Sequence, residues 1–198
     1  MKLYWCPGTR SFSALWLLEE AEARYERELI DIRAQMQDTD DFRRINPMGK
    51  VPVLVDGKAV VSEQGAICVF VADRMPQAGL APAPEDPLRG PYLKWLFFVG
   101  NCIEPAYMQA HLGFTATKSQ AAWGSHGLVV DVLDGALRNG PWILGERFSA
   151  ADIMIGCAVW FGLAFGLLEE RDSFLAYRKR CMARPGFQRA DRIEKAGA

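Results

Sequence analysis

The sequence has few of the residues that build metal clusters and disulfide frameworks. Its 198 residues include two histidines, His111 and His126, and five widely spaced cysteines without a C-x-x-C pair. An odd number of scattered cysteines predicts no disulfide framework, and two histidines are too few to predict a multi-histidine metal site. We therefore expect no metal, and we expect the reducing environment of the cytoplasm.

Charge of one sign and long apolar segments are also missing. Lys and Arg number 23 and Asp and Glu number 24, so the formal net charge is -1. Surfaces that bind nucleic acid or anionic lipid are basic, so we expect neither partner. The longest uncharged run, residues 153–168, is shorter than the ~20 residues of a bilayer span. We expect this run to form a buried helix.

The first third of the chain alternates between two kinds of element. Apolar runs and alternation predict strands, and helical spacing predicts helices. The expected strands and helices are, in order, strand 2–5, helix 13–23, strand 25–32, strands 51–55 and 59–61, and helix 63–75. Asp56-Gly57 between two β-rich runs predicts a tight hairpin. This order predicts a mixed sheet with helices packed on it.

A change in composition divides the chain. Five prolines fall between residues 76 and 91, and no strand pattern follows them. We expect a first domain over 1–76, a linker over 77–86, and an all-helical domain over 87–198. The expected helices of that second domain cover 88–111, 118–139, 150–169 and 173–184. Ser149-x-x-Asp152 has the form of a capping box just before the buried helix.

The segment Asn46-Pro-Met-Gly-Lys-Val-Pro-Val-Leu54 is the most informative in the chain. Pro52 opens an expected strand and removes a donor from its hydrogen-bond ladder. A cis Val51-Pro52 bond accounts for this, since it turns the Val51 main chain outward to pair with an extended, peptide-like ligand. Cis bonds occur at only about 5–6% of X-Pro sites, so this expectation needs further support.

With three other segments, this one resembles the cytosolic glutathione transferase family of bacterial type. The other matching segments are the N-terminal Met-Lys-Leu-Tyr with Pro7-Gly8, Ser-Glu-Gln-Gly-Ala-Ile over 62–67, and Leu-Gly-Glu-Arg-Phe-Ser-Ala-Ala-Asp over 144–152. Their order covers nearly the whole chain. The resemblance implies an α/β thioredoxin-like domain followed by an all-α domain, a homodimer, and glutathione as co-substrate.

The resemblance also implies which residues bind glutathione. Val51, before the expected cis Pro52, would pair with the cysteinyl main chain, and Glu63 with Gln64 would bind the γ-glutamyl end. That pair opens a helix, whose free N–H groups and dipole favour a carboxylate. Many relatives have serine at Gln64, so the amide must replace a hydroxyl. Simple capping of the helix by this segment is the alternative. Lys50 either reaches the glycyl carboxylate or is a solvated loop residue.

The resemblance also suggests where the catalytic residue lies, but this sequence differs from the family pattern at that position. The reaction needs a thiolate, whereas an ordinary thiol has a pKa of about 8.5. Bacterial cysteine-type relatives would place their cysteine at Arg10, and serine-type relatives would place their serine at Thr9. Ser11 is our first candidate for stabilising the thiolate and Thr9 is our second, with Arg10 as an electrostatic helper. A helix-capping role for Ser11 is the structural alternative.

The helical domain should hold a hydrophobic electrophile, with Asn101 and Tyr107 as the expected pocket walls. Two other functions remain open. Cys6-Pro7 is similar to the Cys-Pro opening of glutaredoxins, which suggests a glutathione-dependent thioltransferase or reductase acting through Cys6. A non-enzymatic binding module on the same fold is the other alternative. The electrophile and the reaction subtype do not follow from the sequence.

Overall fold

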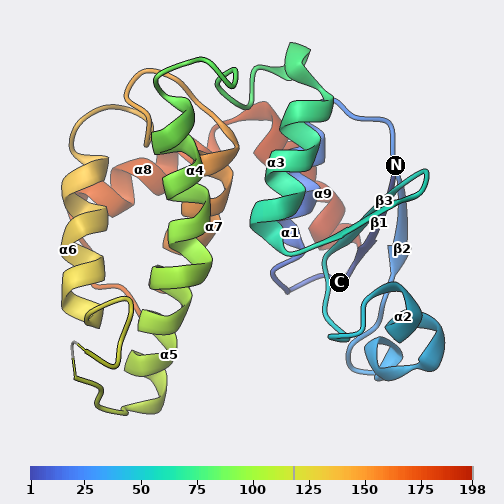
Figure 1. The fold of residues 1–198 in the computed structure, drawn as a ribbon, viewed down its shortest axis with the longest axis horizontal. Helices are drawn as coiled ribbons and strands as arrows, with labels where there is room; N and C mark the ends of the chain where they lie inside the picture. Colours follow the sequence, from blue (N-terminus) through green and yellow to red (C-terminus); the bar gives the residue numbers. More distant parts are fainter. Residues whose placement is uncertain (118, 198) are drawn as a thin grey trace. The chain divides into compact units, whose positions relative to one another are not determined.

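The computed structural model describes residues 1–117 and 119–197 (Figure 1). Residue 118, where the helix expected over 118–139 begins, and residue 198 lie outside this description. The chain forms two compact units. One unit consists of Met1–Leu80 together with Arg184–Ala198, and the other consists of Ala81–Ala183.

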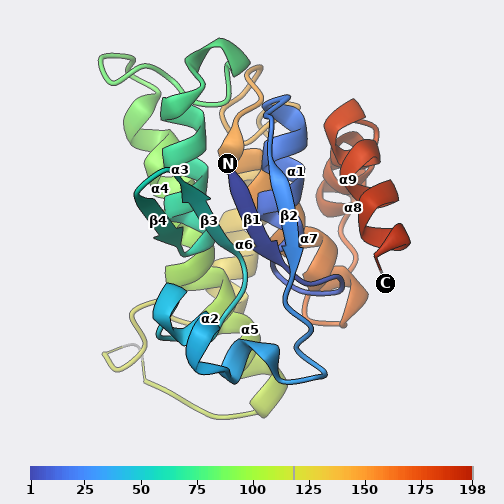
Figure 2. The same ribbon diagram turned by 90° about the vertical axis from the view of Figure 1, so that its right-hand side faces the viewer.

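The first unit is built on a four-stranded mixed sheet (Figure 2). Its strands are β1 (Lys2–Trp5), β2 (Glu26–Leu29), β3 (Val53–Asp56) and β4 (Ala59–Ser62). Their spatial order is β2-β1-β3-β4, with β1 and β2 parallel and the other two pairs antiparallel. Asp56 pairs with Ala59, and Gly57 between them has φ +60°. The predicted hairpin is therefore confirmed, since a positive φ is readily adopted by glycine.

The two faces of this sheet carry different layers. Tyr4 and Val53 pair with one another, and both pack near Phe42 of α2 (Asp40–Ile45). Side chains alternate between the faces of a strand, so Leu3 and Leu54 face the opposite layer. That layer holds α1 (Phe12–Glu20) and α3 (Gln64–Arg74), which contact each other. Helices on a mixed sheet are the predicted thioredoxin-like arrangement.

Helix α2 lies in a polar segment for which no element was predicted. Thr39 caps it by accepting a hydrogen bond from the N–H of Phe42. Asp40 and Asp41 occupy its first turn, where carboxylates interact favourably with the helix dipole. The helix has one buried residue, Phe42. Two apolar positions, Phe42 and Ile45, are too few for a periodic signal, so the apolar pattern did not indicate this helix.

The last helix, α9 (Pro185–Ala196), was not predicted either, and it packs on α1. The Phe187 ring meets the Trp16 ring edge-on, with centroids 5.1 Å apart. Arg184 makes two 2.8 Å contacts with the carboxylate of Glu20. These contacts group α9 with the first unit, whereas the sequence division had placed residues 184–198 in the helical domain. Pro185 in the first turn is typical of a helix start.

The second unit is all helical, as predicted. Its helices are α4 (Arg89–Phe98), α5 (Glu104–Leu112), α6 (His126–Leu137), α7 (Ala150–Ala164) and α8 (Asp172–Met182). A π-helical turn, Val99–Ile103, joins α4 to α5. The predicted capping box is present at α7, where Asp152 Oδ2 accepts the N–H of Ser149 at 2.9 Å. In the described part of the chain, no helix is long and apolar enough to span a membrane.

Candidate functional site

Three loops meet at one end of the sheet in the first unit. Tyr4 pairs with Val53, and Val53 pairs with Ser62 on its other side. Because these pairs are antiparallel, β1 ends, β3 begins and β4 ends at the same edge of the sheet. All the residues predicted for the N-terminal domain lie on the segments that leave or enter the sheet at this edge. Sequence positions up to 55 residues apart are therefore brought together.

The loop before β3 has the predicted backbone. The Val51-Pro52 bond is cis, as expected. Asn46, which is 4% exposed, donates from Nδ2 to the carbonyl of Lys50 at 2.8 Å and accepts the N–H of Met48 at 3.2 Å. The side-chain amide of Asn46 thus fixes the loop from inside. This position was not among the predicted site residues.

Val51 is half-buried and lies just outside β3. Within residues 1–117 and 119–197, no hydrogen bond joins its main chain to another residue. A main-chain N–H and C=O that are left unpaired beside a sheet are suited to an extended ligand, which supplies the missing partners. The side chain of Lys50 is exposed at the same loop, and Pro52 is buried.

The loop between β1 and α1 holds two hydroxyl groups against one carbonyl. Thr9 Oγ1 lies 2.7 Å from the carbonyl oxygen of Cys6, and Ser11 Oγ lies 2.8 Å from the same oxygen. The two hydroxyl oxygens are 2.7 Å apart, and Ser11 Oγ also accepts the N–H of Cys6 at 3.0 Å. Ser11 is fully buried, whereas Thr9 is partly exposed. The hydroxyls therefore differ in their access to a ligand.

The number of hydroxyl hydrogens in this cluster indicates that Thr9 and Ser11 have different roles. Each supplies one hydrogen, and the carbonyl of Cys6 needs only one of them. If Thr9 turned its hydrogen toward a ligand, Ser11 would still satisfy that carbonyl. If Ser11 were lost, the buried N–H of Cys6 would lose its acceptor. The geometry gives Ser11 a loop-holding role and leaves Thr9 the more available donor.

The start of α3 forms the third side of the edge. Glu63 is exposed and has φ 66° and ψ 123°, a conformation that side-chain-bearing residues rarely adopt. Gln64 Nε2 donates to the carbonyl of Arg10 and to Ser13 Oγ, both at 2.8 Å. Both amide hydrogens of Gln64 are thus used inside the protein, where they hold α3 to the start of α1. The main-chain N–H groups of the first turn of α3 remain as anion donors.

The residues predicted for the electrophile pocket lie in the second unit, in different surroundings. Tyr107 is 3% exposed, and its hydroxyl donates to the carbonyl of Ala158 at 3.0 Å. This places Tyr107 in the core of the helical unit. Asn101 is exposed within the π-helical turn. π-helical turns occur frequently at functional sites, and they change which side chains face outward.

Cys6 offers little access for chemistry. Its thiol is free, and the residue is 7% exposed at the end of β1. Burial of this kind is typical of a structural cysteine, whereas reactive cysteines are partly exposed in electropositive surroundings. The main chain of Cys6 has a clearer role, because it holds both hydroxyls of the loop.

The family of the chain follows from sequence comparison. Residues 1–73 match the family model described as "Glutathione S-transferase, N-terminal domain", and residues 105–185 match "Glutathione S-transferase, C-terminal domain". The chain belongs to the glutathione S-transferase family. The expected resemblance and the expected fold are therefore confirmed. As an enzyme, the chain is a glutathione S-transferase.

Two curated relatives from Escherichia coli cover most of this glutathione S-transferase. Disulfide-bond oxidoreductase YfcG of strain K12 is 30% identical over 171 residues, which are 80% of this chain and 77% of that protein. Glutathione S-transferase GstA of strain O157:H7 is 26% identical over 201 residues, with 96% of each chain covered. The two names describe different activities.

Solved structures agree over nearly the full length. A glutathione transferase from Methylococcus capsulatus has a TM-score of 0.83 at 29% identity, and the match covers 98% of each chain. A sphingomonad glutathione S-transferase complexed with glutathione has a TM-score of 0.80 at 30% identity, covering 98% of this chain and 99% of that one. Glutathione is thus bound by a relative with this architecture.

One contact at the site, between Gly8 and Glu194, could not be predicted from the sequence. The N–H of Gly8, in the loop that carries Thr9, donates to Glu194 Oε1 at 2.6 Å. Burial raises the pKa of the Glu194 carboxyl above its usual value. The two residues are 186 positions apart, and α9 itself was not predicted. No local signal could have pointed to Glu194.

Proposed function

We propose that this glutathione S-transferase binds glutathione along the edge where β1, β3 and α3 meet, and directs its sulfur at a hydrophobic electrophile. The observation that carries the proposal is the unpaired main chain of Val51 beside the cis Pro52. The cysteinyl part of glutathione has one N–H and one C=O, which match the two free groups of Val51 as an added strand.

The two ends of glutathione would meet groups of suitable charge. The γ-glutamyl carboxylate is suited to the free N–H groups at the start of α3, and its ammonium group to the exposed carboxylate of Glu63. The Gln64 side chain would act indirectly, since it holds α3 against the loop of Arg10. Lys50 is exposed on the neighbouring loop and would take the glycyl carboxylate.

Thr9 would stabilise the glutathione thiolate, with Ser11 holding the loop. Thr9 is the partly exposed hydroxyl, and the carbonyl of Cys6 keeps Ser11 as its donor when Thr9 turns to the sulfur. The guanidinium of Arg10 would add a favourable positive charge. The thiolate would then attack an electrophilic carbon, forming the C–S bond as the leaving group departs. Lowering the thiol pKa by about two units needs about 2.7 kcal/mol.

We further propose that the electrophile is small and apolar, that Asn101 lies at its site, and that the enzyme acts in detoxification as a cytoplasmic homodimer. Support for a solvent-facing role of Asn101 is its exposure in a π-helical turn. Tyr107 is better suited to supporting that turn, because its hydroxyl already has a main-chain acceptor. The homodimer and the cytoplasm rest on the family resemblance.

Calorimetry and thiolate absorbance test the proposal together. Wild type should bind glutathione and lower its thiol pKa to about 6.5 from about 8.5. Thr9→Ala should keep binding, return the pKa toward 8.5 and lower kcat/KM about 100-fold, with Thr9→Ser close to wild type. If Ser11→Ala has this effect instead, Ser11 is the donor. The absence of heat at millimolar glutathione would overturn the whole proposal.

Disulfide reduction is a second candidate function, favoured by the relative YfcG, which is named a disulfide-bond oxidoreductase. A glutathione thiolate held at Thr9 could attack a disulfide as well as a carbon. A route through the thiol of Cys6 is disfavoured by its burial. Reduction of 2-hydroxyethyl disulfide by wild type and by Cys6→Ser separates the routes. Equal rates would exclude Cys6, and loss of activity in the variant would assign the reaction to it.

A further inference from the structure

Strand β2 is an edge strand with an open side. It pairs only with β1 in the described sheet. The N–H groups of Glu26 and Ile30 donate toward β1, to the carbonyls of Met1 at 3.0 Å and Trp5 at 2.9 Å. Main-chain groups alternate in direction along a strand, so those of Arg27 and Leu29 face the open side. Such a row of unpaired groups can accept another strand.

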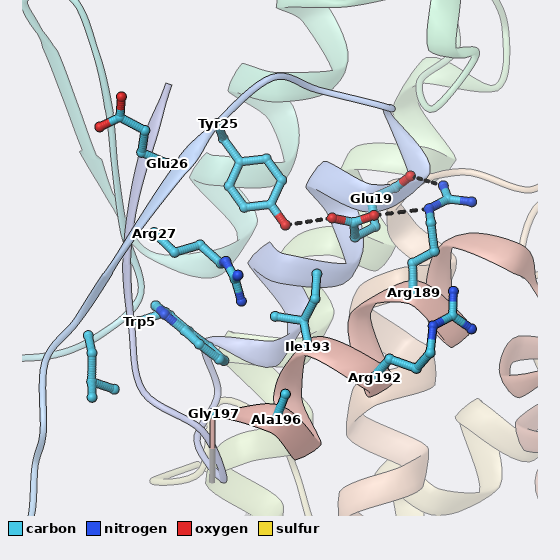
Figure 3. A pocket seen from close by; sticks show the side chains of 11 residues that line it. Trp5, Glu19, Tyr25, Glu26, Arg27, Arg189, Arg192, Ile193, Ala196 and Gly197 are labelled. Carbon is cyan, nitrogen blue, oxygen red and sulfur yellow. Dashed lines mark hydrogen bonds and ion pairs between the residues drawn. The ribbon is translucent and has the colours of Figure 1, made fainter.

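A groove of about 950 Å³ runs beside this edge, between β2 and α9 within the first unit (Figure 3). Its lining residues are Trp5, Glu19, Tyr25, Glu26, Arg27, Leu29, Arg189, Arg192, Ile193, Ala196 and Gly197. Tyr25, Arg27 and Leu29 are alternate residues, so their side chains share one face of the chain. A strand added to β2 would direct every second side chain into this groove.

Two arginines of the groove, Arg27 and Arg192, have no carboxylate partner among the described residues. Glu19 is occupied, because Tyr25 donates to its Oε1 at 2.6 Å and Arg189 donates to its Oε2 at 2.9 Å. In Figure 3 the Glu26 carboxylate points away from the other lining side chains. The guanidinium of Arg27 lies 5.5 Å from the centre of the Trp5 ring.

Neither Arg27 nor Arg192 forms an ion pair with another residue in the described part of the chain. Both are exposed. The groove lining contains three arginines and two glutamates, so it has a small net positive charge. Negatively charged side chains would complement Arg27 on β2 and Arg192 on α9.

We propose that this groove receives an extended, acidic segment of a partner protein, which adds to β2 as a fifth strand. The main chain of Arg27 and Leu29 would supply the pairing, and acidic side chains two positions apart would enter the groove toward Arg27 and Arg192. A small organic anion would neutralise the arginines but leave the outward N–H and C=O groups of β2 unused.

A second copy of this chain fits the edge poorly. Antiparallel pairing of two β2 strands centred on Arg27 would place arginine opposite arginine and Glu26 opposite Glu28. Like charges directly opposite each other destabilise a strand pair. The charges of β2 thus disfavour self-association at this edge and favour a partner protein of different sequence.

Fluorescence anisotropy with a defined peptide tests this site. The probe is a dye-labelled octapeptide of alternating glutamate and valine, acetylated and amidated, titrated with the full chain. Wild type should bind it saturably, and more weakly as salt rises. Arg192→Glu should weaken binding at least tenfold. Lys195→Glu makes the same charge change on α9 outside the groove and should match wild type. No binding by wild type, or equal loss in both variants, would refute the site.

Two N-methylated peptides test strand addition separately from charge. One carries N-methyl groups on all glutamates and the other on all valines, so each removes the donors on one edge of the extended peptide. Binding should be lost for one peptide and kept for the other. Equal affinities of the two peptides would mean that charge alone holds the probe, and would overturn the added strand. Thermal unfolding of Arg192→Glu checks that the variant is folded.

Discussion

At the residue scale, two glutamates hold backbone conformations that favour glycine. Glu63 has φ 66° and Glu22 has φ 50°, and both are exposed. A side-chain-bearing residue in such a conformation costs about 1–3 kcal/mol. Strained residues cluster at functional sites, and Glu63 stands at the proposed γ-glutamyl end of the site, whereas Glu22 lies away from it.

We predict that Glu63→Gly stabilises the protein and weakens glutathione binding. Relief of the backbone strain, less the entropy cost of glycine, should raise the free energy of unfolding by about 1 kcal/mol. Loss of the carboxylate should weaken glutathione binding about tenfold or more. Urea unfolding and calorimetry measure the two effects.

Glu22→Gly is the matched control for this change. It relieves a positive φ in the same unit, away from the three loops, so it should stabilise the protein without changing the affinity for glutathione. Equal weakening of binding in both variants would contradict a specific role for Glu63.

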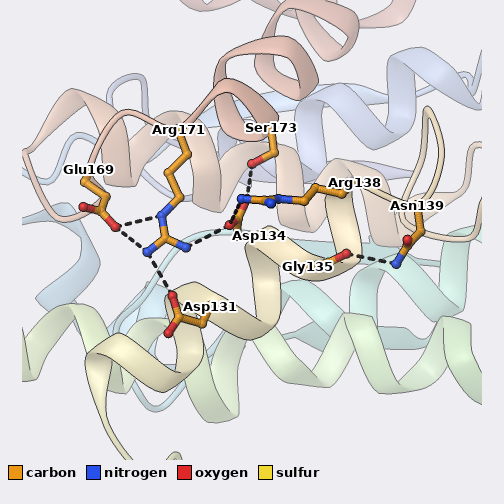
Figure 4. A network of polar contacts seen from close by, with 8 residues as sticks. All are labelled: Asp131, Asp134, Gly135, Arg138, Asn139, Glu169, Arg171 and Ser173. Carbon is orange, nitrogen blue, oxygen red and sulfur yellow. Dashed lines mark hydrogen bonds and ion pairs between the residues drawn. The ribbon is translucent and has the colours of Figure 1, made fainter.

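At the element scale, one carboxylate joins α6 to the start of α8 (Figure 4). Asp134 accepts hydrogen bonds from Arg138 at 2.7 Å and 3.1 Å, from Arg171 at 2.9 Å, and from Ser173. The Asp134 side chain is 8% exposed. The hydrogen bonds, those from Arg138 above all, lower the pKa of Asp134 to about 2.

This pKa predicts the pH range in which Asp134 stabilises the helical unit. The folded-state pKa lies below the ordinary 3.8, so the stabilisation is present above about pH 4 and is lost as the pH falls toward 2. Asp134→Asn should lower the free energy of unfolding by about 1–2 kcal/mol at pH 7, after allowance for solvent screening at exposed Arg138. Denaturant titrations across this range should show the difference vanish near pH 2.

Asp131→Asn provides the comparison for Asp134. Asp131 also pairs with Arg171, at 2.9 Å, but its side chain is 69% exposed. An exposed pair contributes little, so this variant should lose less than about 0.5 kcal/mol at any pH. An effect as large as that of Asp134→Asn would show that burial is not what strengthens the contact.

At the scale of the whole molecule, the end of the chain returns to the unit in which it began. Phe187 is 8% exposed and packs against the rings of Trp16 and Phe12, with centroid distances of 5.1 Å and 5.3 Å. Phe187→Ala should therefore destabilise the first unit by about 3–4 kcal/mol. Hydrogen exchange should show this as faster exchange in α1.

Phe165→Ala makes the same truncation in the second unit, where Phe165 is 64% exposed. It should cost less than about 1 kcal/mol and leave exchange in α1 unchanged. Faster exchange in α1 in this variant, or unchanged exchange there in Phe187→Ala, would contradict the grouping of α9 with α1.

Local chemistry explains why much of the fold was predictable. The hairpin at Asp56-Gly57 and the capping box of Ser149 each follow from residues close together in sequence, whereas the cis bond at Val51-Pro52 was expected with support from the family resemblance. Apolar residues at helical spacing likewise predicted α1 and α3. Helix α2 gave no such signal because it buries one side chain. Helix α9 was missed although Phe187, Ala190 and Ile193 recur at helical spacing between charged residues, a pattern that favours a surface helix.

The sequence by itself determined the alternation of strands and helices and the change from a mixed first part to a helical second part, and its resemblance to the family supplied the candidate site residues. Only the tertiary structure decided how accessible each candidate site residue is and which groups it contacts. The side chains of Ser11 and Gln64 form hydrogen bonds inside the protein. Tertiary packing also placed Tyr107 in a core and brought Glu194 to Gly8. Local pattern predicts an element because the interactions within it are short-range. The access of a side chain depends on which distant segments pack over it.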